Sequence, residues 1–256
     1  MNRIKNAFTS GKAFVAFITC GDPDLETTAA AVREAAANGA DMVELGIPFS
    51  DSTVDGEVVQ TSNLRALAKG VTTDKIFAMV ENLRQEVRIP LLFMTYANVI
   101  FSYGIDKFIS KCSEVGIDGI IVPDLPFEEK EEFQPACCKY GVKLISVVSL
   151  TSDERISMIV RKAEGFIHLA SNMDGVNVKQ VDYEKLELVM KKIRCCTELP
   201  CVIGLEDTEF QHAKTIAGLA DGLMVDNVIV KLMTEYGVDA AKRVGEYVAK
   251  FKQCIN

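Results

Sequence analysis

The sequence alternates short apolar runs with longer amphipathic stretches along its length of 256 residues. The apolar runs are continuous, which is typical of strands that are buried on both faces. They cover residues 14–19, 42–45, 90–95, 119–122, 143–148, 165–170, 200–203 and 222–225. Eight strands that alternate with helices favour a closed parallel barrel. We therefore predict a (β/α)8 barrel, the TIM-barrel architecture, with residues 1–256 as a single domain of the usual size for this fold.

The stretches between the apolar runs have the spacing of helices that bury one face. In residues 73–87 the apolar side chains Ile76, Met79, Val80 and Leu83 form one stripe. The other predicted helices cover residues 26–37, 105–115, 128–139, 152–163, 183–193, 208–217 and 238–251. Residues 2–10 predict a further helix that covers the barrel floor. Three similar phrases, at residues 38–41, 114–118 and 218–221, indicate a repeated helix–turn–strand unit.

Charge and cysteine usage exclude several classes of partner. The formal net charge is −8, whereas nucleic-acid binding needs clustered Lys and Arg. No apolar run reaches the ~18 residues of a membrane span, and no signal peptide precedes the first run. The eight cysteines form no CxxC pair, so we expect reduced thiols and no metal site. The composition therefore predicts a cytoplasmic protein with no nucleic-acid or membrane partner.

Polar residues at the carboxyl ends of the predicted strands are the candidates for chemistry, because active sites of such barrels lie there. Glu44 falls inside an apolar run. Burial raises the pKa of a carboxyl group, which suits proton transfer near neutral pH, although a buried strand glutamate is also commonly structural. Asp55 either reaches into the same pocket or caps a turn. Asp124 either caps the next segment or touches a neighbouring loop, and Tyr96 lies where it could line a pocket.

Six blocks match one known family in order and spacing. They are FITCGDP (17–23), ELGIPFSD (44–51), DG (55–56), RALAKGVT (65–72), MTYAN (94–98) and VPDLP (122–126). Through these blocks the sequence resembles the tryptophan synthase alpha chain from about residue 8 to about residue 250. The resemblance implies a lyase of tryptophan biosynthesis that cleaves indole-3-glycerol phosphate to indole and glyceraldehyde 3-phosphate, with no cofactor. It also implies a tryptophan synthase beta chain as partner in a hetero-oligomer such as α2β2.

The resemblance assigns roles to individual residues. Glu44 matches the family's general acid and base, and Asp55 matches the carboxylate that holds the indole N–H. One carboxylate then moves protons while the other stays ionised. The positions expected to bind the indole ring are Phe17, Met94, Tyr96, Asp124 and His168. His168 falls where several members have a tyrosine, and it is either a polar group at the barrel mouth or a packed strand-end residue.

The corner that would bind the substrate phosphate departs from the family pattern. The altered positions are Asn177, Val178, Gly204, Glu206, Asp226 and Asn227. Asp226 and Asn227 replace a Gly-Ser pair at the start of the helix after the last strand. Aspartate is a good N-cap and brings negative charge to the place where the helix dipole should meet phosphate. Lys179 is the one basic residue of these segments that could offset the repulsion.

Three functions remain open at this point. The chain is a lyase with an altered phosphate grip, an impaired homologue that mainly binds and activates the beta chain, or a lyase for a related indole substrate without phosphate. Retention of both candidate carboxylates favours catalysis. Asp51 and Asn98 match contact positions for the beta chain. Ser52, Thr53 and Glu57 differ from the family there, so that surface has changed.

Overall fold

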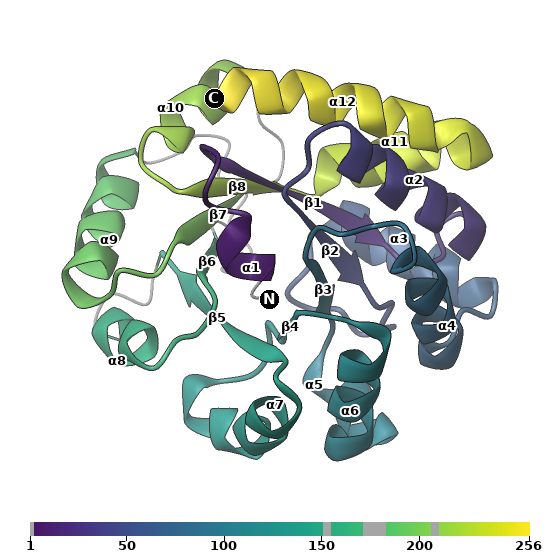
Figure 1. The fold of residues 1–256 in the computed structure, drawn as a ribbon, viewed down its shortest axis with the longest axis horizontal. Helices are drawn as coiled ribbons and strands as arrows, with labels where there is room; N and C mark the ends of the chain where they lie inside the picture. The colour runs from purple at the N-terminus through teal and green to yellow at the C-terminus, as the bar shows by residue number, and fades with distance from the viewer. Residues whose placement is uncertain (1–2, 151–154, 171–182, 206–209) are drawn as a thin grey trace.

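The computed structural model describes residues 3–150, 155–170, 183–205 and 210–256. Eight parallel strands form a closed barrel in sequence order, and β8 pairs with β1 (Figure 1). The strands are β1 (Ala13–Thr19), β2 (Met42–Gly46), β3 (Leu91–Met94), β4 (Gly119–Ile121), β5 (Lys143–Ser149), β6 (Ile167–Ala170), β7 (Cys201–Leu205) and β8 (Gly222–Val225). The predicted (β/α)8 barrel is confirmed, and the strand ends differ from the predicted ones by two residues or fewer.

Helices surround the barrel, and the short helix α1 (Arg3–Asn6) lies across one end of it (Figure 1). Ile4 of α1 is buried in the interior cluster of the barrel, so the predicted floor helix is present in a shorter form. The others are α2 (Leu25–Ala37), α3 (Glu57–Ala68), α4 (Thr73–Leu83), α5 (Ala97–Tyr103), α6 (Ile105–Val115), η1 (Phe127–Glu132), α7 (Gln134–Tyr140), α8 (Ile156–Arg161), α9 (Tyr183–Cys196), α10 (Phe210–Ala217), α11 (Asn227–Tyr236), η2 (Gly237–Asp239) and α12 (Ala240–Ile255).

The helix predictions need three corrections. The helix predicted at 128–139 is divided at Phe133 into η1 and α7, because Pro135 lacks the N–H that a continuous helix would need and instead lies in the first turn of α7. The helix predicted at 73–87 ends at Leu83. Helices α3, α5 and α11 were not among the predicted amphipathic stretches. The first residues of the helices predicted at 152–163 and 208–217 lie outside the described part of the chain.

The repeated phrases before β2, β4 and β8 have a common structural role. Each ends in an aspartate whose Oδ2 accepts the backbone N–H of the first or second residue of the preceding strand. The pairs are Asp41 with Phe14 at 2.7 Å, Asp118 with Leu91 at 3.0 Å and Asp221 with Cys201 at 2.7 Å. Each carboxylate also pairs with a basic side chain, namely Lys252, Arg84 and Arg194 respectively. These aspartates bind the first part of the preceding strands and so help to set their position along the barrel axis.

Alternate strand residues point into the barrel, as the period of two requires. The interior cluster includes Val15, Phe17, Met42, Leu92, Ile121, Ile145, Phe166, Val202 and Met224. The same alternation directs Glu44 of β2, His168 of β6 and Asp226, directly after β8, toward the interior at the carboxyl end. The barrel therefore places polar groups above an apolar floor.

Candidate active site

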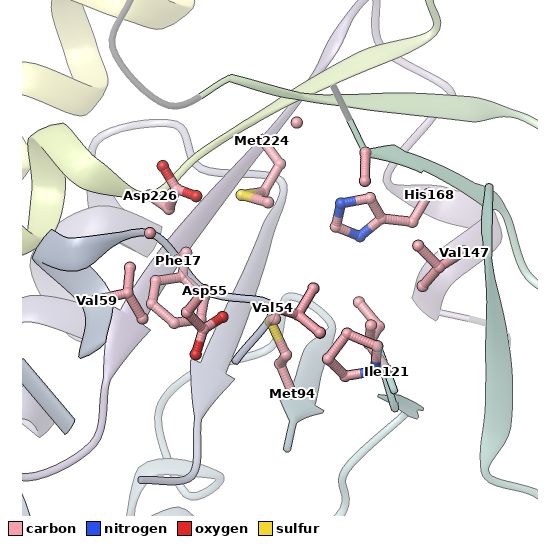
Figure 2. A pocket seen from close by; sticks show the side chains of 14 residues that line it. Phe17, Val54, Asp55, Val59, Met94, Ile121, Val147, His168, Met224 and Asp226 are labelled. Atoms are coloured by element: carbon pink, nitrogen blue, oxygen red, sulfur yellow. The ribbon is translucent and has the colours of Figure 1, made fainter. Parts of the chain in front are cut away.

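A cavity of about 670 Å³, including its open mouth, lies at the carboxyl ends of the strands. Its apolar walls are Phe17, Val54, Val59, Met94, Ile121, Pro123, Val147, Ala170 and Met224. Asp55 and Asp226 lie on the same side as Phe17, and the His168 ring faces them from the opposite side (Figure 2). Such a cavity, with apolar walls and a few polar groups, suits an apolar ligand that carries polar substituents.

Glu44 is not among the residues that line this cavity: it is buried, with an exposed fraction of 1%, on the strand next to the lining residue Phe17. Its backbone pairs in register with Phe17 on β1 and Leu92 on β3. Neither carboxylate oxygen has a hydrogen-bond partner among the described residues. Burial raises the pKa of Glu44 to about 8, and the charges of Asp226 and Asp55 add to the rise. Glu44 is therefore protonated at neutral pH and can act first as an acid.

Asp55 has a different environment because polar side chains surround it. Burial raises its pKa to about 6, while hydrogen bonds from Tyr96, Asn63 and Ser52 act in the opposite direction. Asn63 Nδ2 lies 3.3 Å from Asp55 Oδ2 and 3.2 Å from Ser52 Oγ. Near pH 7 the two carboxyl groups therefore differ, with Glu44 protonated and Asp55 mostly ionised. This separation is what acid–base chemistry by a pair of carboxylates requires.

Sequence reasoning missed Asn63 as a member of the site. It belongs to the buried stripe of α3, which consists of Val59, Ser62, Asn63 and Ala66. A helix at 57–68 with two polar residues in its buried stripe would have been the signal. Ser52 was noted only as a change on the surface that faces the beta chain, whereas its side chain is buried and hydrogen-bonded to Asn63.

The expected indole positions divide into two groups. Phe17, Met94 and His168 line the cavity. Tyr96 does not line it: its hydroxyl accepts the N–H of Val54 at 3.1 Å and supports Asp55 from behind. Asp124 also lies elsewhere, and its Oδ1 accepts the N–H of Ala97 at 2.9 Å, at the start of α5. The block 122–126 lies at the barrel mouth, as predicted. The side chain of Asp124 contacts the neighbouring loop, which is one of the two roles predicted for it.

His168 combines both roles that the sequence left open. It is packed, with an exposed fraction of 5%, and its ring lines the cavity. Burial lowers the pKa of His168 to about 4, so the imidazole is neutral at physiological pH. Its Nδ1 has no hydrogen-bond partner within the described ranges. A neutral imidazole in this place can exchange a hydrogen bond with a ligand but brings no positive charge.

The described part of the phosphate corner consists of Gly204, Asp226 and Asn227. Asp226 is the N-cap of α11, and its carboxylate accepts the N–H of Asn227, as predicted from the sequence. Gly204 and Asp226 line the cavity, and Asn227 is buried. The other positions named for this corner, Asn177, Val178, Glu206 and Lys179, lie outside the described residues. A carboxylate thus occupies the helix N-terminus at the cavity edge.

Two of the sequence blocks meet next to the site and tie its elements together. The buried Asp22, from the block 17–23, accepts a hydrogen bond from Ser62 Oγ at 2.6 Å and pairs with Arg65 at 2.6 Å. Arg65 also donates to Thr234 Oγ1 at 2.6 Å, on α11. The loop after β1, helix α3 and helix α11 are therefore fixed relative to one another, which holds Asn63 and Asp226 in place.

The same ranges of the chain show no sign of a metal centre or a membrane segment. They contain no group of three or more His, Cys, Asp or Glu side chains arranged to hold a metal ion. None of their helices is long and apolar enough to cross a membrane. All eight cysteines are free thiols, and Cys20, Cys112, Cys137 and Cys201 are buried.

Comparison with known proteins agrees with this geometry. The family model described as "Tryptophan synthase alpha chain" matches residues 4–256. The chain is 36% identical to the tryptophan synthase alpha chain of Lacticaseibacillus casei, over 100% of this chain and 96% of the relative. It is 41% identical to the one of Thermoanaerobacter sp. (strain X514), over 100% of both chains. A crystal structure of tryptophan synthase subunit alpha from Legionella pneumophila superposes with a TM-score of 0.90 at 29% identity, covering 100% of this chain and 98% of that one.

Proposed function

The chain belongs to the tryptophan synthase alpha chain family, and we propose that Glu44 and Asp55 carry out its reaction. The chain is a lyase that cleaves indole-3-glycerol phosphate to indole and glyceraldehyde 3-phosphate in tryptophan biosynthesis. The observation that carries the assignment of roles is the difference between the two carboxyl groups. The pKa of Glu44 is raised to about 8, and that of Asp55 to about 6, so only one of them is an acid at pH 7.

The proposed reaction has two proton transfers and one bond cleavage. Protonated Glu44 donates its proton to C3 of the indole ring, and Asp55 stabilises the positive charge that develops at the indole N–H. Glu44, now a carboxylate, accepts the proton of the hydroxyl group on the adjacent glycerol carbon. The C3–carbon bond breaks with its electron pair returning to the ring, which yields indole and the aldehyde. The proton that Glu44 gave is thus replaced, and no cofactor takes part in these steps.

The family match favours this activity over the two alternatives left open by the sequence. An impaired activator would need no acidic Glu44 beside an ionised Asp55, yet the site keeps both, with Asn63 and Tyr96 around Asp55. A lyase for an indole without phosphate rests only on the altered corner. The charge of Asp226 affects a different quantity, the affinity for the substrate phosphate.

Alpha chains of this family work in a complex with the beta chain and bind a small-molecule substrate. We propose that this chain forms such a complex, with α2β2 stoichiometry, through the loop after β2 and helix α5. Asp51 and Asn98, which match the contact positions, are exposed there, as are Thr53 and Glu57. The exposed Phe101 on α5 adds apolar surface to this face. We also propose that residues 1–256 act as one domain and that the chain works in the cytoplasm, in line with its free thiols.

Indole release from indole-3-glycerol phosphate, measured with and without a beta chain, tests these roles. Glu44→Gln and Asp55→Asn should each lower kcat by at least about 10²-fold, because each removes a group that acts on the reacting atoms. Glu235→Gln is the matched control, since it also changes a carboxylate to an amide but lies exposed on α11, away from the cavity lining and from the proposed interface. Near-normal turnover by Glu44→Gln would refute the role of Glu44. Unchanged activity of both partners on mixing, at saturating alpha chain, would refute the complex.

A further inference from the structure

We propose that Asp226 is a positioning residue for the reaction, which acts through Glu44 and holds that side chain in its proton-donating form. The inference rests on the role of Glu44 proposed above. It concerns a residue that the sequence marked only as an obstacle to phosphate binding. Three observations carry it: the place of Asp226 in the barrel, the way its charge is held, and the lack of any described cation near Glu44.

Asp226 continues the inward-facing positions of β8. Gly222 and Met224 precede it at intervals of two, and both Met224 and Asp226 line the cavity. Strand β1 lies between β8 and β2, so Asp226 and Glu44 flank the Phe17 position from its two sides. Figure 2 shows the Asp226 carboxylate on the same side of the cavity as Phe17 and Asp55. The barrel thus brings a third carboxylate to the pair that performs the chemistry.

The N-terminus of helix α11 stabilises the negative charge of Asp226. Its carboxylate accepts the N–H of Asn227 at the N-terminus of α11, a helix of ten residues. A helix N-terminus favours an anion through its free N–H groups and its dipole. Glu44 has no such support, because neither of its oxygens has a hydrogen-bond partner among the described residues. The N–H of Asn227 thus favours negative charge on Asp226, whereas no hydrogen bond from the described residues favours negative charge on Glu44.

The other titratable groups around Glu44 do not cancel this effect. Burial is the largest cause of the raised pKa of Glu44, and Asp226 and then Asp55 are the charges that act on it. Burial raises the pKa of Tyr96 and lowers that of His168, so both are uncharged at neutral pH. No Lys or Arg among the described residues lines the cavity. Asp226 is thus the strongest charge that keeps Glu44 protonated.

This role gives a reason for a carboxylate at the phosphate corner of a functioning lyase. A proton donor must be protonated before the indole ring can accept its proton. The anion at position 226 enlarges the protonated fraction of Glu44 at neutral and mildly alkaline pH. The same anion weakens phosphate binding. The chain therefore has a larger protonated fraction of Glu44 and a lower affinity for its substrate.

The test compares Asp226→Asn with Glu235→Gln. Asparagine keeps the size of the side chain and its ability to cap α11, and only the charge is lost. Glu235→Gln removes the same charge from an exposed position of the same helix. The pKa of Glu44 is measured by carbon-13 NMR of labelled glutamate carboxyl groups, with its signal assigned by its loss in Glu44→Gln. We expect the pKa of Glu44 to fall by about one unit in Asp226→Asn and to stay unchanged in Glu235→Gln.

The pH dependence of indole release is the second readout. The alkaline limb of kcat should move to lower pH in Asp226→Asn by the same amount, and Asp226→Ser, which also caps the helix, should repeat the shift. An unchanged pKa of Glu44 in both variants overturns the proposal, and so does a lowered pKa with an unmoved alkaline limb. If the parent chain forms no indole at any pH, the roles given under Proposed function fail. The NMR titration then decides by itself whether Asp226 acts on Glu44.

Discussion

Replacing Asp226 by glycine and Asn227 by serine should strengthen the binding of a phosphate group at the carboxyl end of β8. Asp226 lines the cavity, and its carboxylate occupies the N–H of Asn227. The double substitution removes this negative charge and frees that N–H for a ligand. The N-terminus of α11 then becomes an ordinary anion site, where backbone N–H groups and the helix dipole both favour phosphate.

The size of the effect follows from Coulomb's law. A carboxylate about 5 Å from a phosphate dianion, at an effective dielectric constant of about 20, costs roughly 7 kcal/mol as an upper bound. Water at the open mouth of the cavity and dissolved salt reduce this cost. We therefore expect a net penalty of about 3 kcal/mol in the parent chain, which corresponds to about a hundredfold in the dissociation constant.

Isothermal titration calorimetry with glycerol 3-phosphate measures this difference directly. The double variant should bind about a hundredfold more tightly than the parent, and the gain should shrink as salt is added, because screening acts on the charge alone. Glycerol, which has no charge, is the control and should bind both chains equally. Micromolar binding of glycerol 3-phosphate by the parent chain would refute the electrostatic reasoning.

Three further predictions follow from the buried charges. The unfolding free energy of Glu44→Gln, measured by urea unfolding, should rise relative to that of the parent by about 4 kcal/mol between pH 4.5 and pH 8. The pKa of Glu44 is raised from its ordinary value of 4.5 to about 8, so the parent has the full stabilisation from this protonated group only below pH 4.5 and loses it as the pH rises to 8. Asp118→Asn should lower the unfolding free energy by about 3 kcal/mol, since it leaves the largely buried Arg84 guanidinium without the carboxylate that lies 2.5 Å away. Tyr96→Phe should move the acidic limb of the pH profile of kcat/KM to higher pH, because Tyr96 is the main hydrogen-bond donor that lowers the pKa of Asp55. If the acidic limb does not move, the ionisation of Asp55 does not control that limb.

The barrel was predictable because its strands are continuous apolar runs and its helices mostly have one clear apolar stripe. Local exceptions were not predictable from periodicity alone. Helix α3 has Ser62 and Asn63 in its buried stripe, so its pattern does not look amphipathic, although both side chains are used by Asp22 and Asp55. The division of the helix at Phe133 was visible in the sequence, since Pro135 follows it, but the prediction gave the apolar spacing more weight.

The site was predictable as a set of residue types, and less so as a set of contacts. The family blocks identified Glu44 and Asp55, and strand ends placed them at the right end of the barrel. The neighbours that separate their pKa values come from segments far apart in the chain, the loop after β2, helix α3 and the end of β3. Such contacts depend on strand register and loop direction, which no local pattern encodes. Asp124 illustrates this, since its side chain turns to Ala97 and away from the cavity.

The two effects assigned to Asp226 have opposite signs, and this makes them separable in one enzyme. Its removal should lower KM, because phosphate binds more tightly, and should lower kcat at alkaline pH, because Glu44 loses its proton there. At pH 6, where Glu44 stays protonated even with a pKa lowered by about one unit, only the gain in binding should remain. The ratio of kcat/KM between variant and parent should therefore be largest at low pH and fall toward pH 8. A ratio that is constant across this range would mean that the charge at position 226 acts on the substrate alone.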